Sequence, residues 1–272
     1  MDLGLVGKRA LVLGASRGLG AAIARSLAAE GAHVIAAARG NDVTDGWIAA
    51  LPAEQRARAR AAKLDLADLA SVDALADKLV AEGGVDILVG NSGGPPPGEA
   101  RDARRDDWLK HFEAMAANLF HLAQRLLPGM AERGFGRIVT IASSGVEQPI
   151  PRLALSNGIR AAVVGWSKTL AAEVAGSGVT VNVVLPGRIH TERVDQLDDA
   201  AAARSLFGRL SASGWHTTAI WIRQFVRYRQ EIERDMTARG LKHAQYGPSP
   251  GFQNLRWLKP GYPGDTIEFR GR

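Results

Sequence analysis

A glycine-rich segment follows the first short apolar run of the chain and opens an amphipathic stretch. It reads Gly14-Ala15-Ser16-Arg17-Gly18-Leu19-Gly20. Glycines at a strand-to-helix turn let the backbone approach a pyrophosphate, and the positive end of the helix favours the negative charge of that group. The segment therefore predicts a dinucleotide site. The residues expected to contact the dinucleotide here are Gly14, Ser16, Arg17, Gly18, Leu19 and Gly20.

The end of the second apolar run indicates which dinucleotide is preferred. An acidic residue at this point would bond the ribose hydroxyl of NAD, whereas this chain reads Ala36-Ala37-Ala38-Arg39. Arg39, together with Arg17, favours a 2′-phosphate. The sequence thus predicts NADP(H) in preference to NAD(H), and the alternative for each arginine is a solvated surface position.

Three further segments follow in order: Asp65-Leu66, then Gly90-Asn91-Ser92-Gly93, then a stretch from Val181 to Thr191 that contains Pro186-Gly187. Together with the glycines at 14, 18 and 20, these segments occur in the order typical of the short-chain dehydrogenase/reductase family. The chain from about residue 5 to 195 therefore resembles that family. The resemblance implies that Asp65 contacts the adenine and that the Asn91 turn packs beneath it. It also implies a nicotinamide contact by the Ile189 backbone and the Thr191 hydroxyl. The additional cofactor-binding residues implied are Asp65, Leu66, Asn91, Ser92, Gly93, Arg160, Pro186, Gly187, Ile189 and Thr191.

The catalytic positions are where this sequence departs from the family. Members usually carry a Ser after the fifth strand, then a Tyr, and a Lys four residues after the Tyr. Here Ser143 or Ser144 supplies the serine, Ser156 stands at the Tyr position and Arg160 stands at the Lys position. The chain has no tyrosine before Tyr228, so a small shift of the alignment cannot restore the phenol.

The family also places an Asn from an earlier helix in the site. That position falls on Met115 here, and Asn118, one helical turn away, is a substitute. The combination resembles a subgroup of reductases that are similar to 3-oxoacyl-(acyl-carrier-protein) reductases and depart from the usual tetrad.

These substitutions change the acid that is available for proton transfer. In the usual scheme a phenol protonates the carbonyl oxygen as hydride arrives, and a neighbouring Lys lowers the phenol pKa from about 10. Arg160 keeps the positive charge and can bond the cofactor ribose, but the Ser156 hydroxyl is a far weaker acid. One hypothesis is that Ser143 and Ser156 orient a carbonyl while water relays the proton.

The resemblance implies an oxidoreductase that transfers a hydride between NADP(H) and a carbonyl or hydroxyl substrate, with a 3-oxoacyl thioester as a candidate. An NADP(H)-binding protein with weak or no catalysis is the alternative. A measurement of turnover would distinguish the two hypotheses, because both predict cofactor binding.

Short apolar runs alternate with amphipathic stretches up to about residue 185, which is typical of a parallel sheet. The fold class predicted is α/β, a Rossmann-like doubly wound parallel sheet. The expected strands are Ala10–Gly14, His33–Ala38, Ala62–Leu66, Val85–Val89, Arg137–Ala142 and Val179–Leu185. The expected helices are Gly18–Glu30, Leu69–Glu82, Trp108–Arg133 with one break, and Ser156–Ala175.

The composition changes beyond about residue 199, where ten of the sixteen aromatic residues gather. Segments at 211–220, 251–258 and 263–270 resemble part of a MaoC-like acyl dehydratase, a hot-dog fold. The expected domains are therefore 1–204, which binds NADP(H) and lacks the family's usual last strand, and 205–272, an α+β C-terminal extension. An acyl-thioester-binding or dehydratase-related module is a third reading of the function.

Composition excludes several other classes. The 272 residues include no cysteine, which rules out disulfides and thiolate chemistry, and the histidines show no paired metal-ligand spacing, so no metal is expected. The net charge of +6 is spread among interleaved acids, so no nucleic-acid partner is expected. The N-terminus lacks signal-peptide features and no stretch suits a membrane span, which favours a cytoplasmic location. The family resemblance implies a homo-oligomer through helices 108–133 and 156–175.

Overall fold

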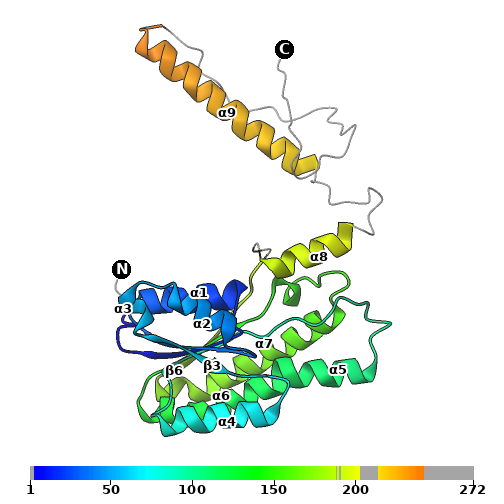
Figure 1. Cartoon of the computed structure of the whole chain (residues 1–272). Coiled ribbons are helices and arrows are strands. Elements are labelled where there is room, and N and C mark those ends of the chain that lie inside the picture. Colours follow the sequence, from blue (N-terminus) through cyan, green and yellow to red (C-terminus); the bar gives the residue numbers. More distant parts are fainter. Residues whose placement is uncertain (1–2, 188, 190, 203–213, 242–272) are drawn as a thin grey trace. The chain divides into compact units, whose positions relative to one another are not determined.

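The structure, a computed structural model, describes residues 3–187, 189, 191–202 and 214–241 (Figure 1). The chain divides into two compact units, Met1–Arg193 and Val194–Arg272, and each is described by itself. The domain boundary predicted between residues 204 and 205 stays a prediction.

Six parallel strands form one sheet in the first unit, in the order β3-β2-β1-β4-β5-β6. The chain moves outward from β1 to β3, crosses back to β4 beside β1, and moves outward again to β6. This is the doubly wound parallel sheet that the sequence predicted. The strands are β1 Arg9–Leu13, β2 His33–Ala38, β3 Ala59–Lys63, β4 Ile87–Gly90, β5 Gly136–Ile141 and β6 Val179–Val184.

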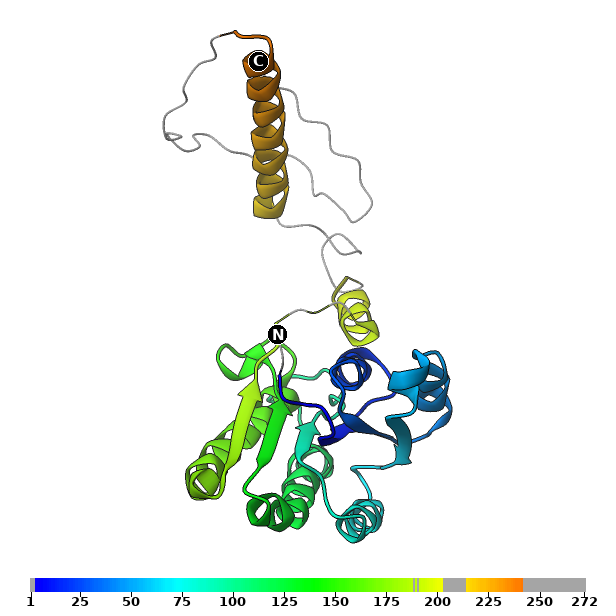
Figure 2. The ribbon, with the colours of Figure 1, turned by 90° about the vertical axis from the view of Figure 1, so that its left-hand side faces the viewer.

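Helices cover both faces of this sheet. Figures 1 and 2 show α1 and α2 on one face and α4, α6 and α7 on the other. The α-helices of the first unit up to residue 174 are α1 Gly18–Ala29, α2 Asp42–Ala49, α3 Ala53–Arg56, α4 Leu69–Ala81, α5 Arg105–Phe112, α6 Asn118–Glu132 and α7 Ala154–Val174. The short 3-10 turns are η2 Ser144–Val146 and η3 Ala175–Ser177.

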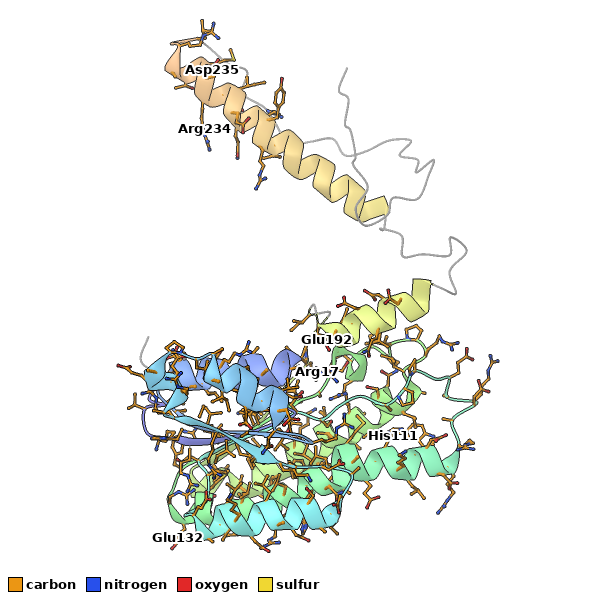
Figure 3. The ribbon with its side chains drawn as sticks, in the orientation of Figure 1. Arg17, His111, Glu132, Glu192, Arg234 and Asp235 are labelled. Carbon is orange, nitrogen blue, oxygen red and sulfur yellow. The ribbon has the colours of Figure 1, made fainter. Side chains whose placement is uncertain are left out.

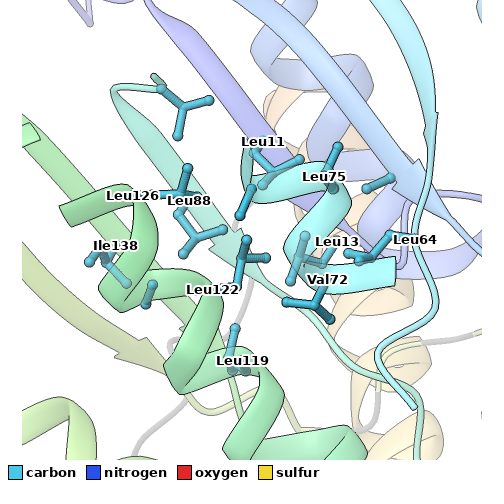
Figure 4. Close-up of a cluster of buried hydrophobic side chains, with 14 of the residues drawn as sticks. Leu11, Leu13, Leu64, Val72, Leu75, Leu88, Leu119, Leu122, Leu126 and Ile138 are labelled. Carbon is cyan, nitrogen blue, oxygen red and sulfur yellow. The ribbon is translucent and has the colours of Figure 1, made fainter. Parts of the chain in front are cut away.

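The larger core lies between the sheet and α4, α6 and α7. Figure 4 shows its aliphatic side chains from both layers, with Leu11 and Leu88 of the sheet near Leu75 and Leu122 of the helices. Each fully buried leucine stabilises the fold by about 1.5–3 kcal/mol relative to an exposed one. This core fixes the sheet so that its strand ends hold constant positions.

The core on the opposite face is built from smaller residues. Ala10 of β1 packs there with Ala24 and Ala28 of α1, and all three are fully buried. Because methyl side chains keep the layers close, α1 approaches the sheet closely at its beginning. This close approach determines where the glycine-rich turn lies.

The position of β3 was predicted wrongly. The expected strand was Ala62–Leu66, but β3 spans Ala59–Lys63, and the other five strand predictions agree within two residues. The apolar pattern misled here because β3 is the edge strand and carries half-buried Arg60 within it. β3 ends at Lys63, and in the loop that follows the Asp65 side chain accepts the Ala67 N–H at 2.9 Å.

Two helical features were not located from the sequence. The short helices α2 and α3 were missed, because eight and four residues are too few to show a clear helical period. The break expected within residues 108–133 is a π-helical segment, η1 Glu113–Ala117, between α5 and α6. Helical structure therefore continues through the break.

The second unit is described mainly by one long helix. This helix, α9, spans Gly214–Ala238, and α8, Glu192–Ala202, straddles the division between the units. The segment whose resemblance implied a helix beginning lies at the start of α9, while the strand expected near residue 265 lies outside the described residues. The hot-dog resemblance stays a prediction. None of the described helices has the length and apolar character that a bilayer crossing needs.

Candidate active site

The glycine-rich turn lies at the point where the order of the parallel strands reverses, between β1 and β4. It follows β1, whose neighbours are β2 and β4, so the turn stands at the carboxyl ends of both halves of the sheet. Open α/β sheets bind ligands at this reversal. The sequence-predicted segments after β1, β2 and β4 all come to this edge.

The turn is a cradle that only glycine permits at two positions. Gly14 has a φ of +60°, and a Cβ there would lie 2.7 Å from the Asn91 carbonyl oxygen. At Gly20 a Cβ would lie 2.1 Å from the Gly14 carbonyl oxygen. Neither contact can be relieved by rotating a side chain, because both involve backbone oxygens. The glycines therefore let the strand end, the helix start and the β4 loop meet.

The first turn of α1 has N–H groups that no side chain caps. Arg17 is its N-cap in extended conformation and makes no side-chain capping bond. A Cβ on Gly18 would come no nearer than 3.7 Å to any other group, namely Thr191 Cγ2. The half-buried Ser16 and Leu19 flank this opening. Uncapped N–H groups and the helix dipole suit an anion at this end.

Asn91 and Trp47 hold the turn from two sides. The Asn91 side-chain amide donates to the Leu13 and Gly14 carbonyl oxygens at 3.3 and 3.4 Å. The buried Trp47 indole donates to the Ala15 carbonyl oxygen at 3.0 Å. Sequence reasoning missed Trp47, which lies in the unpredicted helix α2. Ser92 and Gly93 continue the β4 loop, half-buried and exposed respectively.

Two exposed arginines lie at this edge of the sheet, Arg17 within the turn and Arg39 after β2. Arg17 forms an ion pair with Glu192, at 2.8 Å between Nη1 and Oε2, and Figure 3 shows the two side chains together. Glu192 was not singled out from the sequence, and a partner so distant along the chain leaves no local signal.

The loop after β3 is organised by its own polar groups. The Asp65 N–H donates to Ser71 Oγ at 3.0 Å, and the Leu66 carbonyl accepts from the Asn118 amide at 2.8 Å. Asn118 is only 4% exposed, so its side chain serves this loop. Met115, at the family's Asn position, is likewise buried at 4% exposure.

Arg160 links Ser156 on α7 to the end of β5. Its Nη1 donates to the Ile141 carbonyl oxygen at 2.8 Å and its Nε donates to Ser156 Oγ at 3.3 Å. Ile141 ends β5, two residues before Ser143. The guanidinium thus holds the start of α7 against the end of β5.

Both serine hydroxyls already accept a hydrogen bond. Ser143 Oγ accepts the Gly145 N–H at 3.1 Å, and Ser156 Oγ accepts from Arg160. A hydroxyl that accepts from a donor keeps its own proton for a different acceptor. Each serine can therefore donate to a carbonyl oxygen. Ser144, the alternative serine, begins η2, and its N–H donates to the Pro186 carbonyl oxygen at 3.1 Å.

Two described residues after β6 contact other parts of this edge. The Pro186 carbonyl oxygen accepts from the Ser144 N–H at the start of η2, and Thr191 approaches the Gly18 position at the beginning of α1. Gly187 follows Pro186, and Ile189 is 46% exposed. The site residues predicted from the sequence thus lie along one edge of the sheet. In the described part of the chain, no cluster of three or more His, Cys, Asp or Glu side chains could hold a metal ion.

Comparison with known proteins agrees with this geometry. The model of the short chain dehydrogenase family matches residues 8–202. The 3-oxoacyl-(acyl-carrier-protein) reductase FabG of Escherichia coli (strain K12) is 37% identical over 194 residues, which cover 71% of this chain and 78% of that protein. FabG of Haemophilus influenzae is 34% identical over 198 residues, 72% of this chain and 80% of that protein.

A solved structure extends the comparison to three dimensions. L-Sorbose reductase from Gluconobacter frateurii, complexed with NADPH and L-sorbose, is 33% identical, with a TM-score of 0.70. The alignment covers 76% of this chain and 79% of that one. The similarity therefore includes the sheet and the helices that position the site.

Proposed function

Because this chain belongs to the short chain dehydrogenase family, we propose that it is an oxidoreductase that transfers a hydride between NADP(H) and a carbonyl or hydroxyl substrate. The observation that carries the proposal is the glycine cradle at the point where the strand order reverses, together with the exposed Arg17 and Arg39 at the same edge of the sheet. A 3-oxoacyl thioester is the proposed substrate class, supported by the names of the Escherichia coli and Haemophilus influenzae relatives.

The residues at the cradle fit an NADP(H) cofactor. The space a Cβ would take at Gly14 and Gly20 is filled by backbone, while Gly18 leaves the helix start open. Arg17 and Arg39 would bind the 2′-phosphate, because guanidinium groups match phosphate oxygens in charge and geometry. The NADPH complex of L-sorbose reductase supports this choice.

The chain's own side chains orient the substrate and handle the proton. When bound, the cofactor supplies or accepts the hydride. Ser143 and Ser156 would donate hydrogen bonds to the substrate carbonyl oxygen. These hydrogen bonds would strengthen as negative charge develops on that oxygen. Arg160 raises the local positive potential, and water would deliver the proton that a family tyrosine otherwise provides.

The absence of a phenol at position 156 favours a second candidate, an NADP(H)-binding protein with weak or no turnover. Such a protein would bind the cofactor through the same residues. The dehydratase-related module proposed for residues 205–272 would instead bind acyl thioesters without NADP(H). A homo-oligomer through the helical stretches 108–133 and 156–175, which include α6 and parts of α5 and α7, is part of the proposal, on the family's pattern.

Substrate-dependent oxidation of NADPH with a 3-oxoacyl thioester tests the proposal. Ser156→Ala should reduce kcat at least about tenfold, because an oxyanion donor contributes more than that in many enzymes, while NADPH affinity stays unchanged. Thr169→Ala is the matched control, since Thr169 is an exposed hydroxyl on the same helix that bonds the Gly165 carbonyl oxygen. Undiminished turnover in Ser156→Ala would refute the role of Ser156, and no turnover in wild type would favour the binding-only candidate.

A further inference from the structure

A cavity lined by several charged residues lies at the opposite edge of the sheet, beside the beginnings of β1, β2 and β3. Its volume is about 480 Å³, and it opens to solvent. Among its lining residues are three arginines, one histidine and one carboxylate: Arg9, Arg58, Arg60, His33 and Glu82. The candidate active site uses the carboxyl ends of the strands, so the two sites are distinct.

The strand register brings the cations together. Arg9 of β1 pairs with His33 of β2, and the N–H of the next residue, Val34, donates to the Arg58 carbonyl oxygen at 2.7 Å. Arg60 of β3 pairs with Ile35, two residues after His33 on β2, so Arg60 lies on the same face of the sheet as His33. That face is the one covered by α4, whose C-cap is Glu82.

One carboxylate serves two of these arginines. Arg9 Nη2 lies 3.1 Å from Glu82 Oε2, and Arg60 bonds the same oxygen. Arg9 also donates to the Glu82 carbonyl oxygen, where it favourably meets the negative end of α4. The neighbouring Asp86 accepts the Arg9 main-chain N–H and pairs with Arg133. It therefore does not offset the charge of the cavity.

Arg58 is the one of the three arginines that does not pair with Glu82. The Arg58 side chain lines the cavity, and its buried Nε atom has no hydrogen-bond partner. Because solvent does not reach Nε, a ligand in the cavity would have to bond the terminal nitrogens of this guanidinium. Three guanidinium groups and one carboxylate line the cavity, an excess of two positive charges.

We propose that this cavity, which we call the arginine pocket, binds a small organic or inorganic anion carrying two or more negative charges. Arg58 would bind it through its two terminal nitrogens, the forked geometry that suits phosphate and carboxylate oxygens. Arg9 and Arg60, held by Glu82, would supply the surrounding positive potential. Phosphate and carboxylate share this chemistry, and the experiment below separates them.

Isothermal titration of the full chain with inorganic pyrophosphate, and separately with citrate, tests the proposal. We expect saturable binding of one anion per chain in at least one titration, and the stronger of the two identifies the acid group. Saturating NADPH should leave this binding unchanged, because the arginine pocket and the glycine cradle lie at opposite edges of the sheet. Arg58→Gln should weaken binding about tenfold, as expected for losing a hydrogen bond to a charged group.

Arg56→Gln is the matched control. It removes the same charge two residues away, from an exposed side chain of α3 that does not line the pocket. Should Arg58→Gln fail to fold, Arg58→Lys keeps the charge but removes the forked guanidinium, and it should still weaken binding. No saturable binding, equal loss in the Arg56 and Arg58 variants, or complete displacement by NADPH would each overturn the proposal.

Discussion

Gly20→Ala is the substitution whose consequence follows most directly from the geometry of the cradle. An alanine Cβ would lie 2.1 Å from the Gly14 carbonyl oxygen and 2.9 Å from Asn91 Nδ2, against an ordinary separation of at least 3.4 Å. The turn would have to open by more than about 1 Å, and overpacking of this kind costs about 1–3 kcal/mol. Better helix propensity would offset about 0.5–1 kcal/mol of that cost.

With the middle of each range, the net destabilisation of Gly20→Ala is about 1 kcal/mol, which lowers Tm by roughly 2–4 °C for a unit of this size. Because the same displacement moves the groups proposed to face the pyrophosphate, NADPH affinity should fall at least about tenfold. Thermal unfolding followed by circular dichroism and a fluorescence titration with NADPH measure the two effects. Loss of affinity without the predicted fall in Tm would separate the cradle from the fold and contradict the steric argument.

Gly46→Ala is the control for this experiment. Gly46 lies in α2, and nothing stands within 4 Å of a Cβ built there. Alanine should stabilise this exposed helix position by about 0.5–1 kcal/mol and leave NADPH binding unchanged. If Gly20→Ala behaves like Gly46→Ala in both assays, the reasoning about the cradle is refuted.

Three further predictions concern charged groups. Glu192→Gln should raise the affinity for NADPH severalfold, because it releases Arg17 from its ion pair. The affinity for NADH, measured in the same fluorescence titration, should change little. An equal gain for both dinucleotides would argue against a 2′-phosphate contact. The hydrogen bond with His121 lowers the pKa of Asp73 below its ordinary value of 3.8, so its stabilising contribution is present above that value and is lost as pH falls through the lowered pKa. Asp73→Asn should therefore lower Tm at pH 7 and converge with wild type in acid, and a constant difference would contradict this. Arg152 has a φ of 62°, which costs a non-glycine residue about 1 kcal/mol, so in urea unfolding Arg152→Gly should be about 1 kcal/mol more stable than Arg152→Ala, and equal stability would show no strain.

The cofactor edge of the fold could be predicted from local sequence because its signals are short and ordered. The glycines of the first turn, Arg39 after the second strand and the Asn91 turn each follow an apolar run, and parallel strands bring those ends together. The same logic failed for β3, whose residues at the sheet edge are not continuously apolar. Its predicted position was three residues too late.

Other features depend on contacts that no local pattern records. Trp47 supports the turn from 32 residues away, and Glu192 reaches Arg17 across 175 residues. The arginine pocket likewise assembles only when three separate strands take their register. The serine positions could be read from the sequence, but that both hydroxyls already accept a hydrogen bond is visible only in the folded chain.

A fluorescence titration of the purified chain with NADPH, with NADH as the comparison, tests the central claim most directly. The account predicts saturable binding of NADPH, tighter than that of NADH, with the preference reduced in an Arg17→Gln, Arg39→Gln double variant. Absence of saturable binding to either dinucleotide would contradict the proposal that this chain is an NADP(H)-dependent oxidoreductase.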